Sequence, residues 1–268
     1  MKEGKFNFEG ILGKSIREYR DNFRDIFKFI FLFVGIPSLL LVLIQIVLLI
    51  VKPDLFTMMS TPASLIELDA GTLKLPLYFQ IVSYFFTLVA IFLGIFVSAG
   101  LISTSLKKDK FSFKELVRNA KPRYWKYFGF CIVVLIFILL LSLLLIIPGI
   151  IFGIYWAFAA YVFFDRKKKI RASLKQSREI VKGRWWKTLG YLFLFGLIVI
   201  LFAILVGIIV SIPTLLITTL YLVNHTSLSL TLLIVSSLLS FISGFILNLV
   251  TTPLGILFLK NFYMKMKK

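Results

Sequence analysis

The stretch YFGFCIVVLIFILLLSLLLIIPGIIFGIYWAFAAYVFF, from Tyr127 to Phe164, decides how many times the chain can cross a membrane. It holds 38 residues, and none of them is Asp, Glu, Lys or Arg. A bilayer-spanning helix needs about 20 apolar residues, so the stretch is too long for one span and tight for two. Pro148-Gly149 lies in its middle, and proline fits the first turn of a helix but disrupts its interior. We therefore predict a helical hairpin whose second, short helix begins at Pro148.

The chain as a whole has the composition of a membrane protein. It has 268 residues, is 59% hydrophobic and has a mean hydropathy of +0.97, whereas soluble domains are about 45–50% apolar. Residues 29–51, 75–106 and 188–259 are also free of charge, and the last range is long enough for two spans. The sequence predicts an all-α, polytopic integral membrane helix bundle that forms one membrane domain over residues 1–268. The predicted spans are about 27–51, 77–106, 128–147, 148–164, 188–212 and 229–259.

The basic residues decide between five and six spans. Of the 31 Lys and Arg residues, 29 lie in residues 1–28, 107–126, 166–187 and 260–268. Six spans place all four segments on one face, as the positive-inside rule requires of the cytoplasmic face, whereas five spans separate the two richest segments. We predict six transmembrane helices as three hairpins, with the N- and C-termini cytoplasmic and an outer turn around 213–228.

Three basic segments, 1–26, 107–127 and 165–187, share one pattern. Each alternates apolar and basic residues at helical spacing, which predicts a basic amphipathic helix lying on the membrane surface before each hairpin. Residues 260–268 are expected to form a basic tail. The pairs that carry the pattern are Ile16-Arg17, Tyr19-Arg20, Phe23-Arg24, Phe113-Lys114, Val117-Arg118, Ala120-Lys121, Ile170-Arg171, Leu174-Lys175 and Val181-Lys182.

Two of these segments end alike, in AKPRYWKYFG (residues 120–129) and VKGRWWKTLG (residues 181–190). The likeness fits either duplication of an ancestral hairpin or convergence, because Lys, Arg, Trp and Tyr favour the membrane interface. Cations there would bind anionic phospholipid headgroups. The candidate lipid-anchoring residues are Arg123, Trp125, Lys126, Lys182, Arg184, Trp185, Trp186 and Lys187.

The motifs IPGI (147–150), ASLKQSRE (172–179) and VKGRWWK (181–187), with Trp156 and Asp165 between them, resemble one family. It is the membrane domain attached to some bacterial glycerophosphoryl diester phosphodiesterases, together with its stand-alone six-span relatives. The resemblance implies an integral protein of a prokaryotic plasma membrane. It brings no catalytic or binding residue, since the phosphodiesterase chemistry belongs to a separate soluble domain.

Residues for catalysis, metal binding or cofactor binding are not apparent. The chain has no HExxH, GxSxG or phosphate-loop motif, and its only histidine, His225, and only cysteine, Cys131, lie far apart in the sequence. We expect no enzyme activity, metal or cofactor. The last span carries a polar stripe that is either a helix-packing seam or the wall of a polar groove. Its members are Ser236, Ser240, Gly244, Asn248 and Thr252.

These features favour a non-catalytic multi-pass membrane protein that binds anionic phospholipid and acts as scaffold, anchor or accessory module. The alternative is a permease-like or transport-associated protein with a path along the polar stripe. A third hypothesis is an accessory to a phosphodiesterase that acts on glycerophospholipid breakdown products. The net charge of +19 would suggest nucleic acid for a soluble protein, but these cations flank spans. We expect membrane lipids as partners, no nucleic acid, and either a protein partner or a homo-oligomer.

Overall fold

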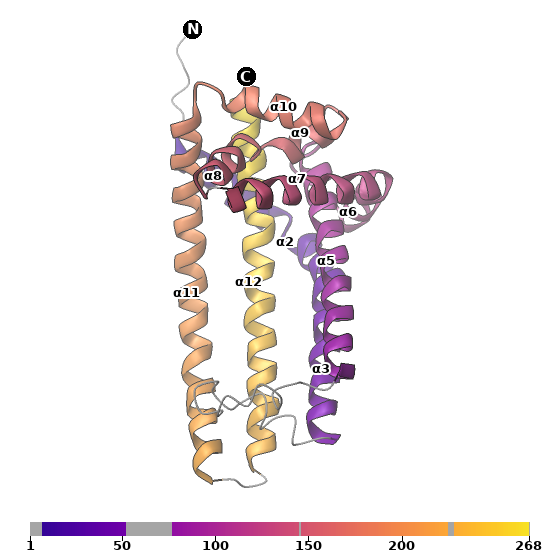
Figure 1. Ribbon diagram of the computed structural model, residues 1–268, viewed down its shortest axis with the longest axis vertical. Helices are drawn as coiled ribbons and strands as arrows, with labels where there is room; N and C mark the ends of the chain where they lie inside the picture. The colour runs from indigo at the N-terminus through magenta and orange to yellow at the C-terminus, as the bar shows by residue number, and fades with distance from the viewer. Residues whose placement is uncertain (1–6, 52–76, 145, 225–227, 268) are drawn as a thin grey trace. The chain divides into compact units, whose positions relative to one another are not determined.

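The computed structural model describes residues 7–51, 77–144, 146–224 and 228–267, and within these ranges all regular structure is helical (Figure 1). The predicted outer loop 52–76 and His225 lie outside the described residues. In chain order the elements are α1 (Phe8–Asp21), α2 (Phe23–Ile30), the π-helical turn η1 (Phe31–Gly35), α3 (Ile36–Val51), α5 (Leu77–Ser105), α6 (Phe113–Ala120), the 3-10 turn η2 (Lys121–Arg123), α7 (Tyr124–Leu144), α8 (Ile146–Tyr155), α9 (Ala159–Asp165), α10 (Ile170–Val181), α11 (Trp185–Asn224) and α12 (Leu228–Met266).

The all-α class and the count of six candidate spans are confirmed. By length and composition, six helical segments among the described residues are apolar enough to cross a membrane. They are Phe23–Val47, Ile81–Ser105, Phe113–Leu143, Ile147–Asp165, Trp185–Pro213 and Ile234–Met266.

Three helix boundaries differ from the predicted ones. The predicted fourth span, 148–164, is divided into α8 and α9 by a turn that places the Phe158 side chain in the core, with no exposed surface. The predicted tail, 260–268, continues α12 as far as Met266, because its aromatic residues are buried in the protein. α11 passes through Pro213 instead of ending there. A proline is tolerated in a membrane helix when the freed carbonyl finds another partner.

The chain divides into two compact units. Unit 1 comprises residues 1–31, 94–202 and 248–268, and unit 2 comprises residues 32–93 and 203–247. Helix α3 of unit 2 is almost wholly apolar and leaves large side chains exposed, such as Leu40 at 50% and Val47 at 57%. In a single chain such faces are suited to contact with lipid.

Unit 1 has an aromatic core where α8, α9 and α10 meet the C-terminal part of α12. The Phe158 ring lies edge-on to Phe262 at 5.2 Å between centroids, and the Phe195 ring stacks on Phe258 at 4.3 Å. Phe158, Phe258 and Phe262 have no exposed surface. Because aromatic rings bury a large area each, this cluster fixes how the end of α12 sits in unit 1.

α7 and α8 pack against each other, but α8 begins at Ile146, so the predicted turn at Pro148-Gly149 lies inside this helix. Proline fits the first turn of a helix, so it does not interrupt α8 there. A Cβ atom on Gly149 would collide with Ser142 Oγ and lie 3.2 Å from Ser142 Cα, so the two helices approach closely only because residue 149 is glycine. Within unit 1, α7 runs across the direction of α12 rather than along it (Figure 1). In an ideal helix bundle α7 would run alongside α12. In unit 1 it does not (Figure 1).

Candidate functional site: a buried polar cluster and the basic surface

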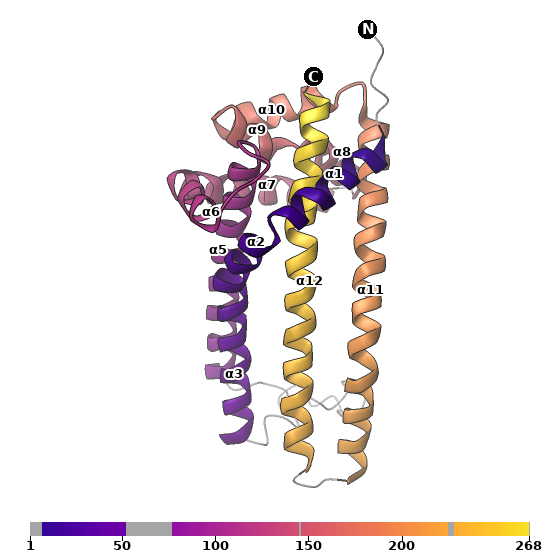
Figure 2. The ribbon, with the colours of Figure 1, turned by 180° about the vertical axis from the view of Figure 1, so that it is seen from behind.

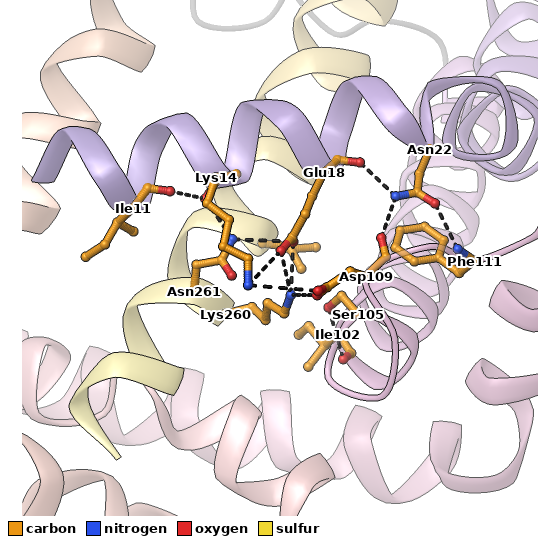
Figure 3. A network of polar contacts seen from close by, with 12 residues as sticks. Ile11, Lys14, Glu18, Asn22, Ile102, Ser105, Asp109, Phe111, Lys260 and Asn261 are labelled. Carbon is orange, nitrogen blue, oxygen red and sulfur yellow. Dashed lines mark hydrogen bonds and ion pairs between the residues drawn. The ribbon is translucent and has the colours of Figure 1, made fainter. Parts of the chain in front are cut away.

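A buried ionic group joins three segments of unit 1 that are far apart in the sequence (Figure 3). Lys260 of α12 donates hydrogen bonds from Nζ to both carboxylate oxygens of Glu18 of α1, at 3.0 and 2.9 Å. It also donates to Oδ1 of Asp109, in the loop between α5 and α6, at 3.0 Å. The Lys260 and Glu18 side chains are only 4% and 7% exposed, whereas Asp109 is 66% exposed. Each proton of the buried ammonium thus has a carboxylate acceptor.

Further polar groups surround this ion pair. Asn261 donates from Nδ2 to Ser15 Oγ at 3.1 Å, and Lys14 Nζ lies 3.4 Å from Glu18 Oε1 at the exposed edge. We call these residues, together with Asn22, the polar cluster: Lys14, Ser15, Glu18, Asn22, Asp109, Lys260 and Asn261. The negative charges of its two carboxylates equal the positive charges of its two ammonium groups. This pairing offsets much of the free-energy cost of removing the charges from water.

Asn22, between α1 and α2, connects the polar cluster to the following loop. Its Nδ2 donates to the carbonyls of Glu18 and Asp109, each at 2.8 Å, and its Oδ1 accepts from the Phe111 amide at 2.8 Å. Asp25 accepts the Phe113 amide at the start of α6 at 2.9 Å. The α1–α2 junction therefore holds both the loop and the start of α6 in place.

α1 crosses the C-terminal part of α12 (Figure 2). At this crossing it supplies a hydrogen bond that the backbone of α12 lacks. Pro253 has no backbone N–H, so the carbonyl of Leu249 lacks its usual donor four residues on. The Tyr19 hydroxyl donates to that carbonyl at 3.2 Å. A side chain of α1 thus replaces the hydrogen bond that the proline removes.

The charges of the polar cluster act on Asp109 in particular. The hydrogen bond from Lys260 is the largest influence and lowers the pKa of Asp109 below its ordinary value of 3.8, with further lowering by the charges of Lys260 and Lys14. Asp109 is therefore ionised at neutral pH and remains a partner of the buried lysine.

Sequence reasoning missed the polar cluster. The sequence places Lys260 in a basic tail, and nothing in its charge pattern singles out Glu18 or Asp109. Two signals were present: Ser15, Glu18 and Asn22 lie three and four residues apart on one helical face, and Lys260 directly follows a long uncharged range. An ionisable group at the end of a span is a candidate functional residue whose partner should be sought.

Most of the predicted lipid-anchoring residues lie on the surface of unit 1. Trp125 and Trp186 are 71% and 78% exposed, and each is the second residue of its helix, α7 or α11. The exposed cations beside them are Lys126, Lys182, Arg184 and Lys187. The two similar sequence segments thus place an exposed tryptophan and lysine at the same position of two helices.

The other two predicted anchors, Arg123 and Trp185, bind main-chain carbonyls of the protein. Arg123 donates to the carbonyl of Phe163 at 2.8 Å near the end of α9, and its guanidinium lies 4.3 Å from the centroid of the Phe163 ring. Trp185 donates from Nε1 to the carbonyl of Ile151 at 3.5 Å. A cation at the end of a helix satisfies carbonyls that have no intrahelical donor. These side chains join helices to one another.

The polar stripe of α12 is divided between the two units. Ser236, Ser240 and Gly244 belong to unit 2, whereas Asn248 and Thr252 belong to unit 1 and share a hydrogen bond of 3.3 Å. Ser240 and Gly244 are exposed, and a Cβ atom on Gly244 would meet no atom within 4 Å. Among the described residues of unit 2, no neighbouring helix packs closely on Gly244, so the seam and the groove both stay predictions.

Within the part of the chain that the structure describes, no three His, Cys, Asp or Glu side chains lie close enough together to hold a metal ion. Comparison with family models, with curated proteins and with solved structures finds no match for this chain.

Proposed function

We propose that this chain is a non-catalytic multi-pass membrane protein that binds anionic phospholipid at its basic face and serves as a scaffold, anchor or accessory module. One observation carries the proposal: Trp125 and Trp186 are exposed at equivalent positions of α7 and α11, beside exposed cations. The proposal includes membership of the phosphodiesterase-associated membrane family, which the motifs between residues 147 and 190 support by resemblance alone.

The chemistry of the two positions suits the boundary between lipid headgroups and acyl chains. An indole ring has an apolar body and one N–H donor, and it settles at headgroup depth. Lysine and arginine beside it reach the phosphates, and each cation near an anionic surface contributes about 1 kcal/mol. Lys182, Arg184 and Lys187 surround Trp186 in sequence and are exposed, so we place the strongest headgroup contact there.

Quenching by brominated lipids tests the contact at Trp186. The chain has four tryptophans, so a variant that keeps only Trp186, with phenylalanine at the other three, reports on one position. In vesicles, brominated phosphatidylglycerol should quench its fluorescence more than brominated phosphatidylcholine at the same mole fraction. Changing Lys182, Arg184 and Lys187 to glutamine should remove the preference, and a variant that keeps only Trp156 should show none. Equal quenching by the two lipids at Trp186 would contradict the proposal.

The membrane topology is the second part of the proposal: six spans in three hairpins, with both termini cytoplasmic and the protein in a prokaryotic plasma membrane. The start of α8 tests it best, because α7 runs across α12 in unit 1 (Figure 1). Ile147, the second residue of α8, is 69% exposed. In a Cys131→Ser chain, Ile147→Cys should react with an impermeant thiol reagent added outside intact cells. Protection from outside, with reaction only after the cells are opened, would show that this hairpin does not cross.

A further inference from the structure

Three helices are predicted to lie at the membrane surface, and of the elements α1–α2, α6 and α10 that form there, only α1–α2 has large apolar side chains that are exposed. In α6, Leu116 and Ala120 have no exposed surface. In α10, Val181 belongs to the aromatic core and Leu174 packs against it. Along α1, α2 and η1, by contrast, large apolar side chains are exposed. They are Ile16 at 48%, Phe23 at 43%, Phe27 at 37% and Phe31 at 38%.

The opposite face of α1 and α2 is fixed by its contacts. Ser15, Glu18 and Asn22 belong to the polar cluster. Glu18 binds Lys260 of α12, and Asn22 binds the loop after α5 (Figure 3). In α2, Ile26 and Phe29 have no exposed surface. The helices cannot rotate to cover the exposed residues without breaking these buried hydrogen bonds. The contacts of unit 1 therefore fix the exposed residues in an outward direction.

The exposed rings follow one another at helical spacing, with centroids 6.1 Å apart for Phe23–Phe27 and 5.7 Å for Phe27–Phe31. The half-buried Tyr19, whose hydroxyl binds the Leu249 carbonyl, lies beside Phe23 at 5.7 Å. An exposed cation directly follows Ile16, Phe23 and Phe27, and Arg20 is exposed between them. We call these exposed residues the α1–α2 outer face: Ile16, Arg17, Arg20, Phe23, Arg24, Phe27, Lys28 and Phe31. Rings beside a row of cations match an anionic lipid surface, with apolar groups toward the acyl chains and positive charge toward phosphate.

We propose that the α1–α2 outer face is a second docking surface for an anionic bilayer, distinct from the one at Trp186. The position of this face in the chain favours a bilayer over a soluble acidic protein as its binding partner. The candidate span Phe23–Val47 begins within α2, so the outer face lies where the chain enters the membrane. Glu18 and Lys260 are positioning residues for this surface, because they hold α1 with its apolar row outward. The inference rests on the proposed function, since both require affinity for anionic lipid.

Photocrosslinking from position 23 tests this surface in the full-length protein. Phe23 is replaced by the photoreactive residue p-benzoylphenylalanine, and the protein is irradiated in vesicles of equal parts phosphatidylglycerol and phosphatidylcholine. The crosslinked lipid is then identified by mass spectrometry. The adducts should contain phosphatidylglycerol at roughly threefold or more over phosphatidylcholine. The same probe at Leu43 of α3, an exposed apolar residue within a candidate span, should give the two lipids equally.

Changing Arg17, Arg20 and Arg24 to glutamine should abolish the preference at position 23 while adducts still form. An equal lipid ratio at Phe23 in the otherwise unchanged chain would overturn the inference, as would adducts confined to the protein's own chain. In native membranes, a crosslink to another protein in place of lipid would show that this face serves a protein partner and would equally overturn it. The Trp186 quenching experiment stands apart, so an equal ratio here with selective quenching there refutes only the second surface.

Discussion

Replacing Lys260 by methionine should destabilise unit 1 more than any other single change in the polar cluster. The substitution keeps the length of the side chain but removes the cation that binds both oxygens of Glu18. Glu18 is 7% exposed and would keep only Lys14, at 3.4 Å, and Asn261 as partners. Breaking a buried ion pair from one side costs about 3–5 kcal/mol, because a charge stays buried without compensation.

Replacing the partner carboxylate, Glu18, or both residues together should change the stability less than Lys260→Met does. Glu18→Met should cost less, since Lys260 keeps Asp109 at 3.0 Å and that carboxylate is 66% exposed. The double variant, with methionine at both positions, should lie close to the native stability. Two apolar side chains of similar volume replace a buried ion pair at little or no cost. Lys265→Met is the matched control, because Lys265 is an exposed lysine of the same helix.

Cys131 supplies the assay. It is the only cysteine of the chain and packs, half-buried, against the aromatic core of unit 1. Its reaction with a thiol-reactive fluorophore during heating in detergent therefore reports the unfolding of that unit. At about 2–4 °C per kcal/mol, Lys260→Met should lower the transition by roughly 6–20 °C. A shift no larger than that of Lys265→Met, or a double variant as unstable as the single one, would refute the role assigned to this pair.

Three further outcomes follow from other contacts, each measured by the same Cys131 reaction. Gly100→Ala should destabilise by about 1–3 kcal/mol because its Cβ would lie 2.8 Å from a buried ring, whereas Gly94→Ala in the same helix, with no atom within 4 Å, should be neutral or slightly stabilising; equal effects would contradict this. Tyr19→Phe should cost about 1 kcal/mol, and much less when Pro253→Ala restores the missing donor; an unchanged cost would refute the replacement bond. Asp109→Asn should be less stable than the native protein at neutral pH by under about 1 kcal/mol. Because the folded-state pKa of Asp109 is lowered, that difference should vanish as the pH falls below its ordinary value of 3.8, and a difference independent of pH would contradict the pairing.

Composition and charge position predicted the class and the number of candidate spans. Long uncharged ranges have few alternatives to membrane helices. Pro148-Gly149 placed the start of the second helix two residues late, because α8 begins at Ile146 and contains both residues. Helix ends were less predictable, because they depend on tertiary contacts that composition does not record. α12 continues past Lys260 since Phe262 and Tyr263 pack into the core of unit 1.

The polar cluster could not be predicted from periodicity alone. Helical spacing shows which residues of α1 share a face, but it does not show which face meets the protein. In α1 the buried face carries Ser15 and Glu18 beside Ile11, whereas the apolar Ile16 is exposed, so polarity alone does not mark the buried face. Only the meeting of α1 with Lys260, 242 residues away, makes this arrangement favourable.

Native mass spectrometry of the intact protein tests the central claim, affinity for anionic phospholipid, most directly. The protein would be released from nanodiscs that contain equal amounts of phosphatidylglycerol and phosphatidylcholine, and the lipids that remain bound would be identified. Phosphatidylglycerol should be retained in clear excess, and glutamine at Lys182, Arg184 and Lys187 should reduce this excess. Retention of the two lipids in equal amounts, or of neither, would contradict this claim.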